Sequence, residues 1–261
     1  MKRKMKTMFC SLQIAFSMYS RIPAVPCRWT KDNMRYVMCF FPLVGAVIGL
    51  LEILWWKAAM LLQLPESAVR IVLLLIPCFV TGGIHLDGMM DTCDAMASYR
   101  PMERRLEILK DPHTGAFAVL RVISWFLLLY AFLSMMEDSL IVPYACLHIL
   151  SRAASALSVV LFRKSSMNGT VTRFGEAASK KAVCAAAALW AAAAAAVILF
   201  LQPVPGICVL AGAAACLIWY RRRAYRYFGG INGDLAGWFL CICELVTAGC
   251  LLGTAHILQI L

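Results

Sequence analysis

Charged side chains are scarce in this 261-residue chain. Only 15% of its residues are charged and 62% are hydrophobic, whereas soluble domains have about 25% charged and about 45–50% apolar residues. Lipid must cover the apolar side chains that exceed the needs of a soluble core. The composition therefore excludes an ordinary soluble domain and indicates an integral membrane protein.

Cysteines in CxxC spacing are also missing. The chain has twelve cysteines, but no two of them form a CxxC pair and most lie inside apolar runs. This pattern lacks the spacing of a zinc site or a disulfide framework, so we expect the cysteines to serve as small core side chains. No internal repeat of 20 to 50 residues is visible either.

Seven apolar stretches approach the length of about 20 residues that a membrane span requires. They cover residues 36–56, 68–84, 116–136, 140–162, 182–202, 204–220 and 235–255. Segment 1–35 begins like a signal peptide, but Ser and Gln interrupt its apolar middle, which favours a helix on the membrane surface. The sequence thus predicts an all-α, polytopic helical bundle with about seven transmembrane helices and an N-terminal interfacial helix, forming one domain over 1–261.

The net charge of +11 has a simple explanation in the membrane topology. Segments 1–35, 85–115, 163–181 and 221–234 contain eight, four, five and four of the 25 cations. Because cytoplasmic loops carry the excess of Lys and Arg, we expect the N-terminus and loop 85–115 in the cytoplasm and the C-terminus outside, across a bacterial inner membrane. No nucleic-acid partner is needed to explain the charge, and a homo-oligomer remains possible.

Three aspartates follow the second apolar stretch. Asp87, Asp91 and Asp94 are spaced i, i+4 and i+7, so they share one face of a helix that continues from that span. Carboxylates so close repel one another unless a cation lies between them, and oxygen ligands suit Mg²⁺, or nearly as well Mn²⁺. The pattern favours a metal site over the alternative, an ordinary solvated face.

Residues beside the aspartates are candidates for binding substrate. Gly88 would let the backbone or a substrate approach closely, and His85 could ligate a metal, bond a carboxylate, contact substrate or be structural. A glycine-rich turn before the last span, with Asp234, could present backbone N–H groups to an anion. Further along this span, Glu244 is a carboxylate within the membrane, and we expect it to pair with Arg121 or Arg152.

A charged amphipathic segment follows the aspartates and ends at a turn from Pro112 to Gly115. Lys110 and Asp111 lie just before this turn. A cation beside an acid can offer one group to phosphate and the other to a metal. These two residues are therefore candidates for phosphate and metal binding.

Two of these motifs carry a specific resemblance. GGIHLDGMMDTCDA at 82–95 and RRLEILKDPHTG at 104–115 resemble the cobalamin synthase family, the adenosylcobinamide-GDP ribazoletransferases, and shorter matches extend over nearly the whole chain. The resemblance implies a membrane enzyme that joins adenosylcobinamide-GDP to α-ribazole or its 5′-phosphate, releases GMP and uses Mg²⁺.

Roles for individual residues follow from this resemblance and the chemistry together. Asp87, Asp91, Asp94 and Asp111 would bind the metal, and either Asp94 or Asp111 would take the proton of the attacking hydroxyl. Lys110 would assist catalysis by holding phosphate oxygens. The expected substrate-binding residues are His85, Arg104, Gly88, Gly115, Arg21 and Asp234.

Two other functions remain as alternatives. The aspartates are also similar to the signature of CDP-alcohol phosphotransferases, although the Ala-Arg that follows Gly88 in that motif is missing. Membrane carboxylates and arginines can also form the path of an ion-coupled transporter. A transporter fits less well because the acids lie at one end of the spans and no duplicated halves are visible.

Overall fold

The computed structural model describes residues 2–165 and 169–261, with side chains from residue 4 onward. Within these residues the chain is helical, and its one bridge of strand type joins Lys164 and Ile231. The α-helices are α1 (Lys2–Tyr19), α2 (Lys31–Met34), α3 (Val37–Leu61), α4 (Glu66–Thr81), α5 (Ile84–Ala97), α6 (Met102–Ile108), α7 (Ala116–Leu133), α8 (Ile141–Leu161), α9 (Thr170–Ala177), α10 (Lys180–Leu201), α11 (Pro203–Phe228), α12 (Gly233–Ala248) and α13 (Thr254–Ile260).

The membrane-spanning helices agree with the apolar stretches of the sequence. Six helical runs are long and apolar enough to cross a bilayer: α3, α7, α8, α10, α11 and a last run, Gly233–Ile260, in which a π-helical turn joins α12 to α13. A seventh crossing is obtained when α4 and α5 are counted as one bent pair. The prediction of a polytopic all-α bundle with about seven spans is confirmed.

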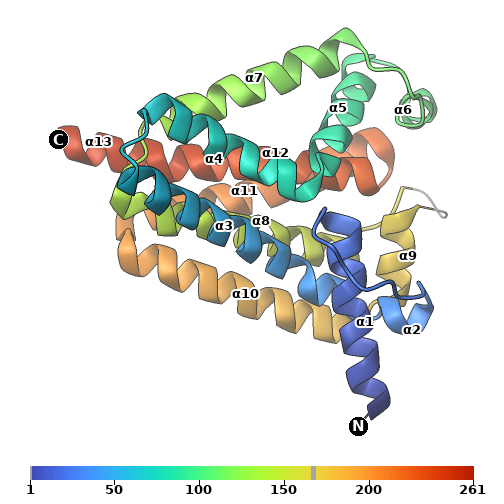
Figure 1. Cartoon of the computed structure of the whole chain (residues 1–261). Coiled ribbons are helices and arrows are strands. Elements are labelled where there is room, and N and C mark those ends of the chain that lie inside the picture. Colours follow the sequence, from blue (N-terminus) through green and yellow to red (C-terminus); the bar gives the residue numbers. More distant parts are fainter. Residues whose placement is uncertain (1, 166–168) are drawn as a thin grey trace.

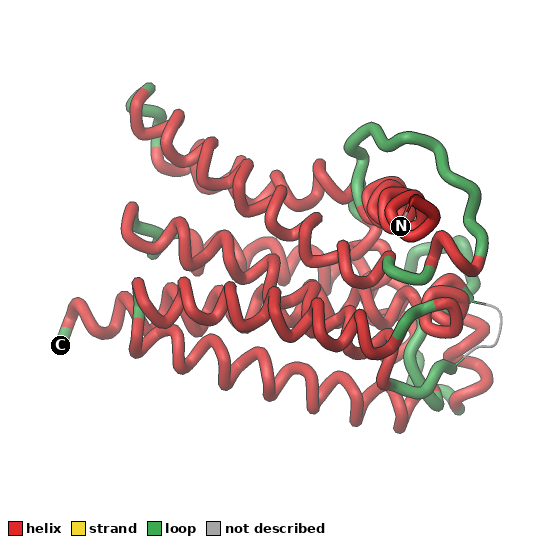
Figure 2. The backbone as a smooth tube through the Cα atoms, turned by 90° about the horizontal axis from the view of Figure 1, so that it is seen from below, coloured by secondary structure: helices red, strands yellow, loops and turns green. Residues whose placement is uncertain are grey.

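Helix α1 lies across one end of this bundle. The spans run side by side in Figure 1, and α1 crosses their direction. Figure 2 looks nearly along α1 while the spans run across the view. In α1, Ile14 and Ala15 are buried against the bundle, whereas Met5, Met8 and Phe9 are exposed. This arrangement is the one expected of an interfacial helix.

The helix that carries the three aspartates differs from the expectation. It does not continue straight from the second span but forms a separate helix, α5, bent by 92° from α4. The bend lies at Gly82 and Gly83, whose φ angles are +66° and +80°. Because side chains with a Cβ rarely adopt such angles, two consecutive glycines allow the span to end and the next helix to turn across its end.

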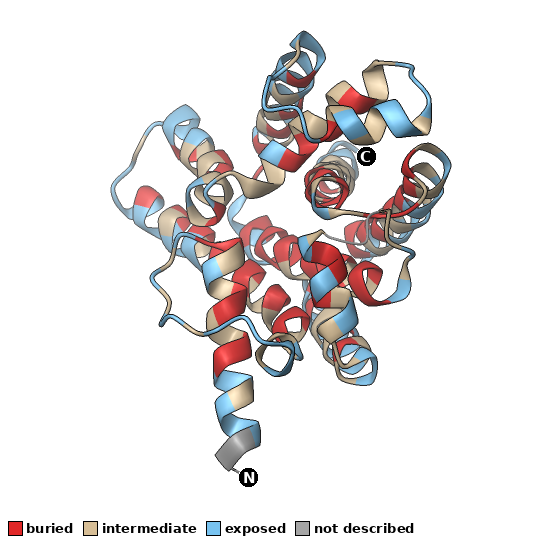
Figure 3. Cartoon of the chain, turned by 90° about the vertical axis from the view of Figure 1, so that its right-hand side faces the viewer, coloured by how far each residue is buried: buried red, intermediate tan, exposed pale blue. Residues whose placement is uncertain are grey.

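The basic segments gather at the same end of the bundle as α5. Helices α1, α2, α6 and α9 and the C-terminal end of α11 all lie there, and the chain's C-terminus lies at the opposite end (Figure 1). Among the candidate spans, α8, the run from α12 to α13 and α3 are the most buried, and α7 and α10 are the least buried. Figure 3 shows the buried residues gathered toward the middle of the bundle. Gly49 lets α3 approach α8, because a Cβ there would lie 2.6 Å from the Ala145 carbonyl oxygen. All twelve cysteines are free, and five of them are buried: Cys10, Cys146, Cys216, Cys241 and Cys243.

Candidate active site

The face of α5 that carries the aspartates begins beside Arg21. The Arg21 N–H donates to the Val80 carbonyl oxygen over 2.7 Å, which ties the segment after α1 to the end of α4. Its side chain covers Gly82, where a Cβ would collide with it. Arg21 and Asp87 line one open cleft of about 570 Å³. The structure therefore brings a guanidinium and the first aspartate together, as the sequence prediction requires.

Two glycines hold α5 against the start of α12. A Cβ on Gly88 would lie 2.8 Å from Cα and from the carbonyl oxygen of Asp234, and one on Gly237 would lie 2.9 Å from the His85 carbonyl oxygen. The close approach places Asp234 where the charges of Asp91 and Asp87 act on it. Gly88 thus lets α5 and α12 meet. Asp234 joins Asp87 and Asp91 in one group of carboxylates, the acidic cluster, rather than forming a separate anion site.

The N-terminus of α12 is fixed by Asn232. Its side-chain oxygen accepts a hydrogen bond from the Leu235 N–H over 2.9 Å, which satisfies one of the free donors of the first turn. Its amide nitrogen lies 3.4 Å from Asp234 Oδ2. The cap therefore also orients the Asp234 carboxylate, a role that the sequence alone did not indicate.

Asp94 uses both of its oxygens to hold the loop before α7. Oδ2 accepts from the Gly115 N–H over 2.6 Å, and Oδ1 accepts from the Ala118 N–H over 2.8 Å. A Cβ on Gly115 would lie 2.7 Å from these oxygens, so only glycine leaves room for the contact. These contacts give Asp94 and Gly115 a positioning role, because they tie the α6–α7 loop to the acidic helix.

Replacing Asp94 by alanine should therefore destabilise the fold by about 1–2 kcal/mol, the upper range for loss of a helix cap. Asp94→Asn, which keeps one acceptor oxygen, should lose about half as much. The unfolding midpoint of the purified protein measures both effects. A loss of activity by Asp94→Asn as complete as that of Asp87→Asn, with unchanged stability, would instead support a direct chemical role.

The residues around α6 line a different cleft. Arg104 pairs with Glu107, and both line an open cleft of about 430 Å³ together with Asp111. Asp111 is exposed, and hydrogen bonds from the backbone and side chain of His113 hold its pKa below the usual range. Lys110 is exposed at the end of the same segment. The structure does not bring these three predicted site residues into the clefts that contain Asp87.

His85 lines a more enclosed cavity of about 260 Å³. Asp87 and Asp234 line this cavity too, so it opens onto the acidic cluster. Among the residues that the structure describes, no group of three or more His, Cys, Asp or Glu side chains is arranged so that it could hold a metal ion by itself. The carboxylates therefore offer a set of oxygen ligands rather than a closed protein site.

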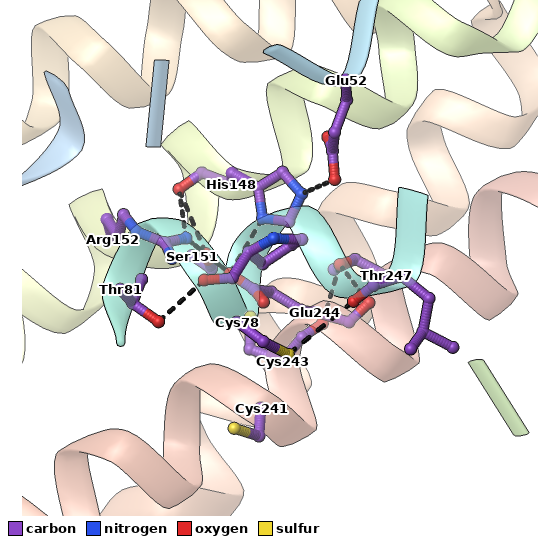
Figure 4. A network of polar contacts seen from close by, with 12 residues as sticks. Glu52, Cys78, Thr81, His148, Ser151, Arg152, Cys241, Cys243, Glu244 and Thr247 are labelled. Carbon is purple, nitrogen blue, oxygen red and sulfur yellow. Dashed lines mark hydrogen bonds and ion pairs between the residues drawn. The ribbon is translucent and has the colours of Figure 1, made fainter. Parts of the chain in front are cut away.

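A buried polar network lies deeper in the bundle (Figure 4). Arg152 Nη1 pairs with Glu244 Oε1 over 2.5 Å, which selects Arg152 from the two expected partners. His148 bridges the acids, with Nδ1 at 3.1 Å from Glu244 Oε1 and Nε2 at 3.0 Å from Glu52 Oε1. Glu52 and His148 were not singled out from the sequence. A lone ionisable residue within an apolar span was the signal that could have found them.

Comparison with known proteins agrees with the motifs. The profile of the cobalamin-5-phosphate synthase family matches residues 11–252. The adenosylcobinamide-GDP ribazoletransferase of Lachnoclostridium phytofermentans is 43% identical over 236 residues, which cover 90% of each chain. The enzyme of the same name from Desulfitobacterium hafniense is 32% identical over 241 residues, which cover 90% of this chain and 93% of the other. One from Clostridium botulinum strain Alaska E43 is 30% identical over 93% of this chain and 96% of its own.

No solved structure matches the chain. The family match covers the acidic helix, the α6–α7 loop and the glycine-rich start of α12. On this match and on the curated relatives, the chain belongs to the cobalamin-5-phosphate synthase family.

Proposed function

We propose that this protein joins adenosylcobinamide-GDP to α-ribazole, or to its 5′-phosphate, and releases GMP. The relatives' shared name supports the substrates. The observation that carries the proposal is the meeting of Asp87, Asp91 and Asp234 where α5 packs on α12, at one end of a membrane bundle. A cluster of carboxylates at an open cleft suits chemistry on a diphosphate.

The reaction replaces a phosphoanhydride bond by a phosphate ester bond. A ribose hydroxyl of the acceptor forms a bond to the phosphorus that carries cobinamide, and the bond from that phosphorus to the GMP oxygen breaks. GMP leaves with the electron pair of that bond, and the hydroxyl proton passes to a carboxylate. Negative charge grows on the phosphate oxygens during this transfer. Arg21, which shares the cleft with Asp87, can bind one of these oxygens.

The acidic cluster also fits a divalent ion. Mg²⁺ is usually bound by one or two carboxylates, waters and substrate phosphates rather than by a complete protein cage, and Mn²⁺ accepts similar oxygen ligands. One or two of Asp87, Asp91 and Asp234 would hold the ion together with waters and the diphosphate, and the ion would supply positive charge there. We assign Asp94 to positioning, because both of its oxygens already accept backbone hydrogen bonds.

The acidic cluster must also accept the proton of the attacking hydroxyl. Asp111 has a lowered pKa and lies in another cleft, both of which disfavour it as the base. A carboxylate of the cluster that is not fully engaged by the ion is better placed to take the hydroxyl proton. Lys110 and Arg104, exposed beside the α6 cleft, would then guide the anionic donor toward the site.

We infer the orientation of the protein in the membrane from the distribution of its basic segments. The basic segments gather at the end that carries α5 (Figure 1), and basic loops stay in the cytoplasm. We therefore place the N-terminus and the acidic cluster on the cytoplasmic side of a bacterial inner membrane and the C-terminus outside. In this orientation the site meets soluble nucleotides directly.

Purified protein given adenosylcobinamide-GDP, Mg²⁺ and α-ribazole should release GMP and form the joined cobalamin product in equal amounts. The same protein given a lipid alcohol in place of α-ribazole should release little GMP. Chromatography of both products measures the outcome. Transfer to the lipid alcohol alone would support a lipid phosphotransferase, and uptake of the corrinoid into vesicles without GMP release would support a transporter.

A further inference from the structure

The enclosed cavity beside the acidic cluster has two chemically different parts. Its walls are apolar, and Met38, Phe41 and Leu240 are each no more than 2% exposed. Asp87 and Asp234 line its opposite side. A molecule that filled this cavity would therefore have an apolar part in the bundle and a polar part beside the carboxylates.

His85 is one of the polar side chains that line the cavity. Its ring stacks on that of Tyr19, with centroids 6.3 Å apart and an interplanar angle of 24°, and meets Phe41 edge-on at 6.0 Å. Its Nε2 is buried and has no hydrogen-bond partner within the described part of the chain. Leaving a buried polar group unpaired is unfavourable. A bound molecule that pairs with Nε2 would remove this cost.

The size of the cavity limits what it can hold. Its volume of about 260 Å³ is below the range of about 300–1,000 Å³ typical of sites for drug-sized ligands. A corrinoid or a whole nucleotide would not fit. A flat, fused pair of rings would fit, with its attached sugar outside the cavity.

We propose that this cavity binds the base of the nucleoside acceptor, which rests on the proposed function. Ribazole carries dimethylbenzimidazole, a flat apolar base with one free ring nitrogen that accepts a hydrogen bond. His85 Nε2–H donates to this nitrogen, Tyr19 and Phe41 pack near the rings, and the ribose points toward Asp87 and Asp234.

The test compares two acceptors that differ at one atom. α-Ribazole and the matching dimethylindole riboside, which has a carbon in place of the free ring nitrogen, are titrated separately into the intact purified protein without donor. We expect the wild type to bind α-ribazole about tenfold more tightly than the indole riboside, the effect of one buried hydrogen bond. His85→Leu should bind the two nucleosides equally, and His85→Gln, which keeps an N–H donor, should retain part of the preference.

His256→Leu is the matched control, because His256 is exposed on α13 at the far end of the bundle. It should keep the wild-type preference. If His85→Leu and His85→Gln also keep that preference, or if the wild type has none, the base does not bind at His85 and the inference is wrong. The proposed function fails separately, when wild-type protein given both substrates forms no joined product.

Discussion

Replacing Asp91 by asparagine should lower the rate of ribazole transfer by about 10²–10³-fold, and Asp87→Asn should do the same. Asparagine has nearly the same shape but lacks the negative charge that would hold a dication beside the diphosphate. Losses of this size are typical when a group that stabilises transition-state charge is removed. GMP release at saturating substrate and Mg²⁺, per mole of folded protein, measures the effect.

Glu103→Gln provides the matched control for these variants. Glu103 is an exposed acid of α6 near the same end of the bundle, and its neutralisation should change the rate less than about twofold. If Asp87→Asn and Asp91→Asn retained rates like that of Glu103→Gln, the acidic cluster would not be the metal site. A uniform loss in all three variants would point to a general effect of surface charge instead.

Replacing Arg152 by methionine should destabilise the protein by about 3–5 kcal/mol, the usual cost of removing one partner from a buried ion pair. Arg152 is 1% exposed and Glu52 is fully buried. Without the guanidinium, Glu244 and Glu52 would keep His148 as their shared hydrogen-bond partner. The unfolding midpoint in detergent, converted to a free energy, measures the loss.

Arg70→Met is the control for Arg152→Met, because it removes an arginine that lies outside the buried network. Arg70 pairs with Glu66, and their side chains are 18% and 74% exposed. Because the Glu66 carboxylate stays in contact with solvent, removal of Arg70 should cost about 1 kcal/mol. The double change Arg152→Met with Glu244→Gln should recover part of the stability, because no unpaired charge remains beside residue 152. Equal effects of Arg70→Met and Arg152→Met would show that the buried network contributes little to stability.

Hydropathy predicted the spans well because burial in lipid depends on each residue's own polarity. The expected stretches 36–56 and 182–202 correspond to α3 and α10 within a few residues. The bend after α4 was not predicted. Its cause, two consecutive residues with positive φ at Gly82 and Gly83, depends on the tertiary position of α5, and a GG pair in a sequence fits a packed helix equally well.

The candidate site was predicted in composition more than in arrangement. Helical spacing correctly placed Asp87, Asp91 and Asp94 on one helix. It could not show that Asp94 caps α7 or that Asp234, far along the chain, lies beside Asp87, because both contacts depend on how α5 packs against other helices. The assigned roles of these residues remain predictions that the variants above test.

We propose above that a divalent ion, held by one or two carboxylates among Asp87, Asp91 and Asp234, is needed on the diphosphate during transfer. The most direct measurement is GMP release from adenosylcobinamide-GDP and α-ribazole by purified protein freed of divalent ions with a chelator. We predict that release falls to about 1% or less of its normal rate and returns when Mg²⁺ is restored. Full-rate release by the metal-free protein would contradict the account.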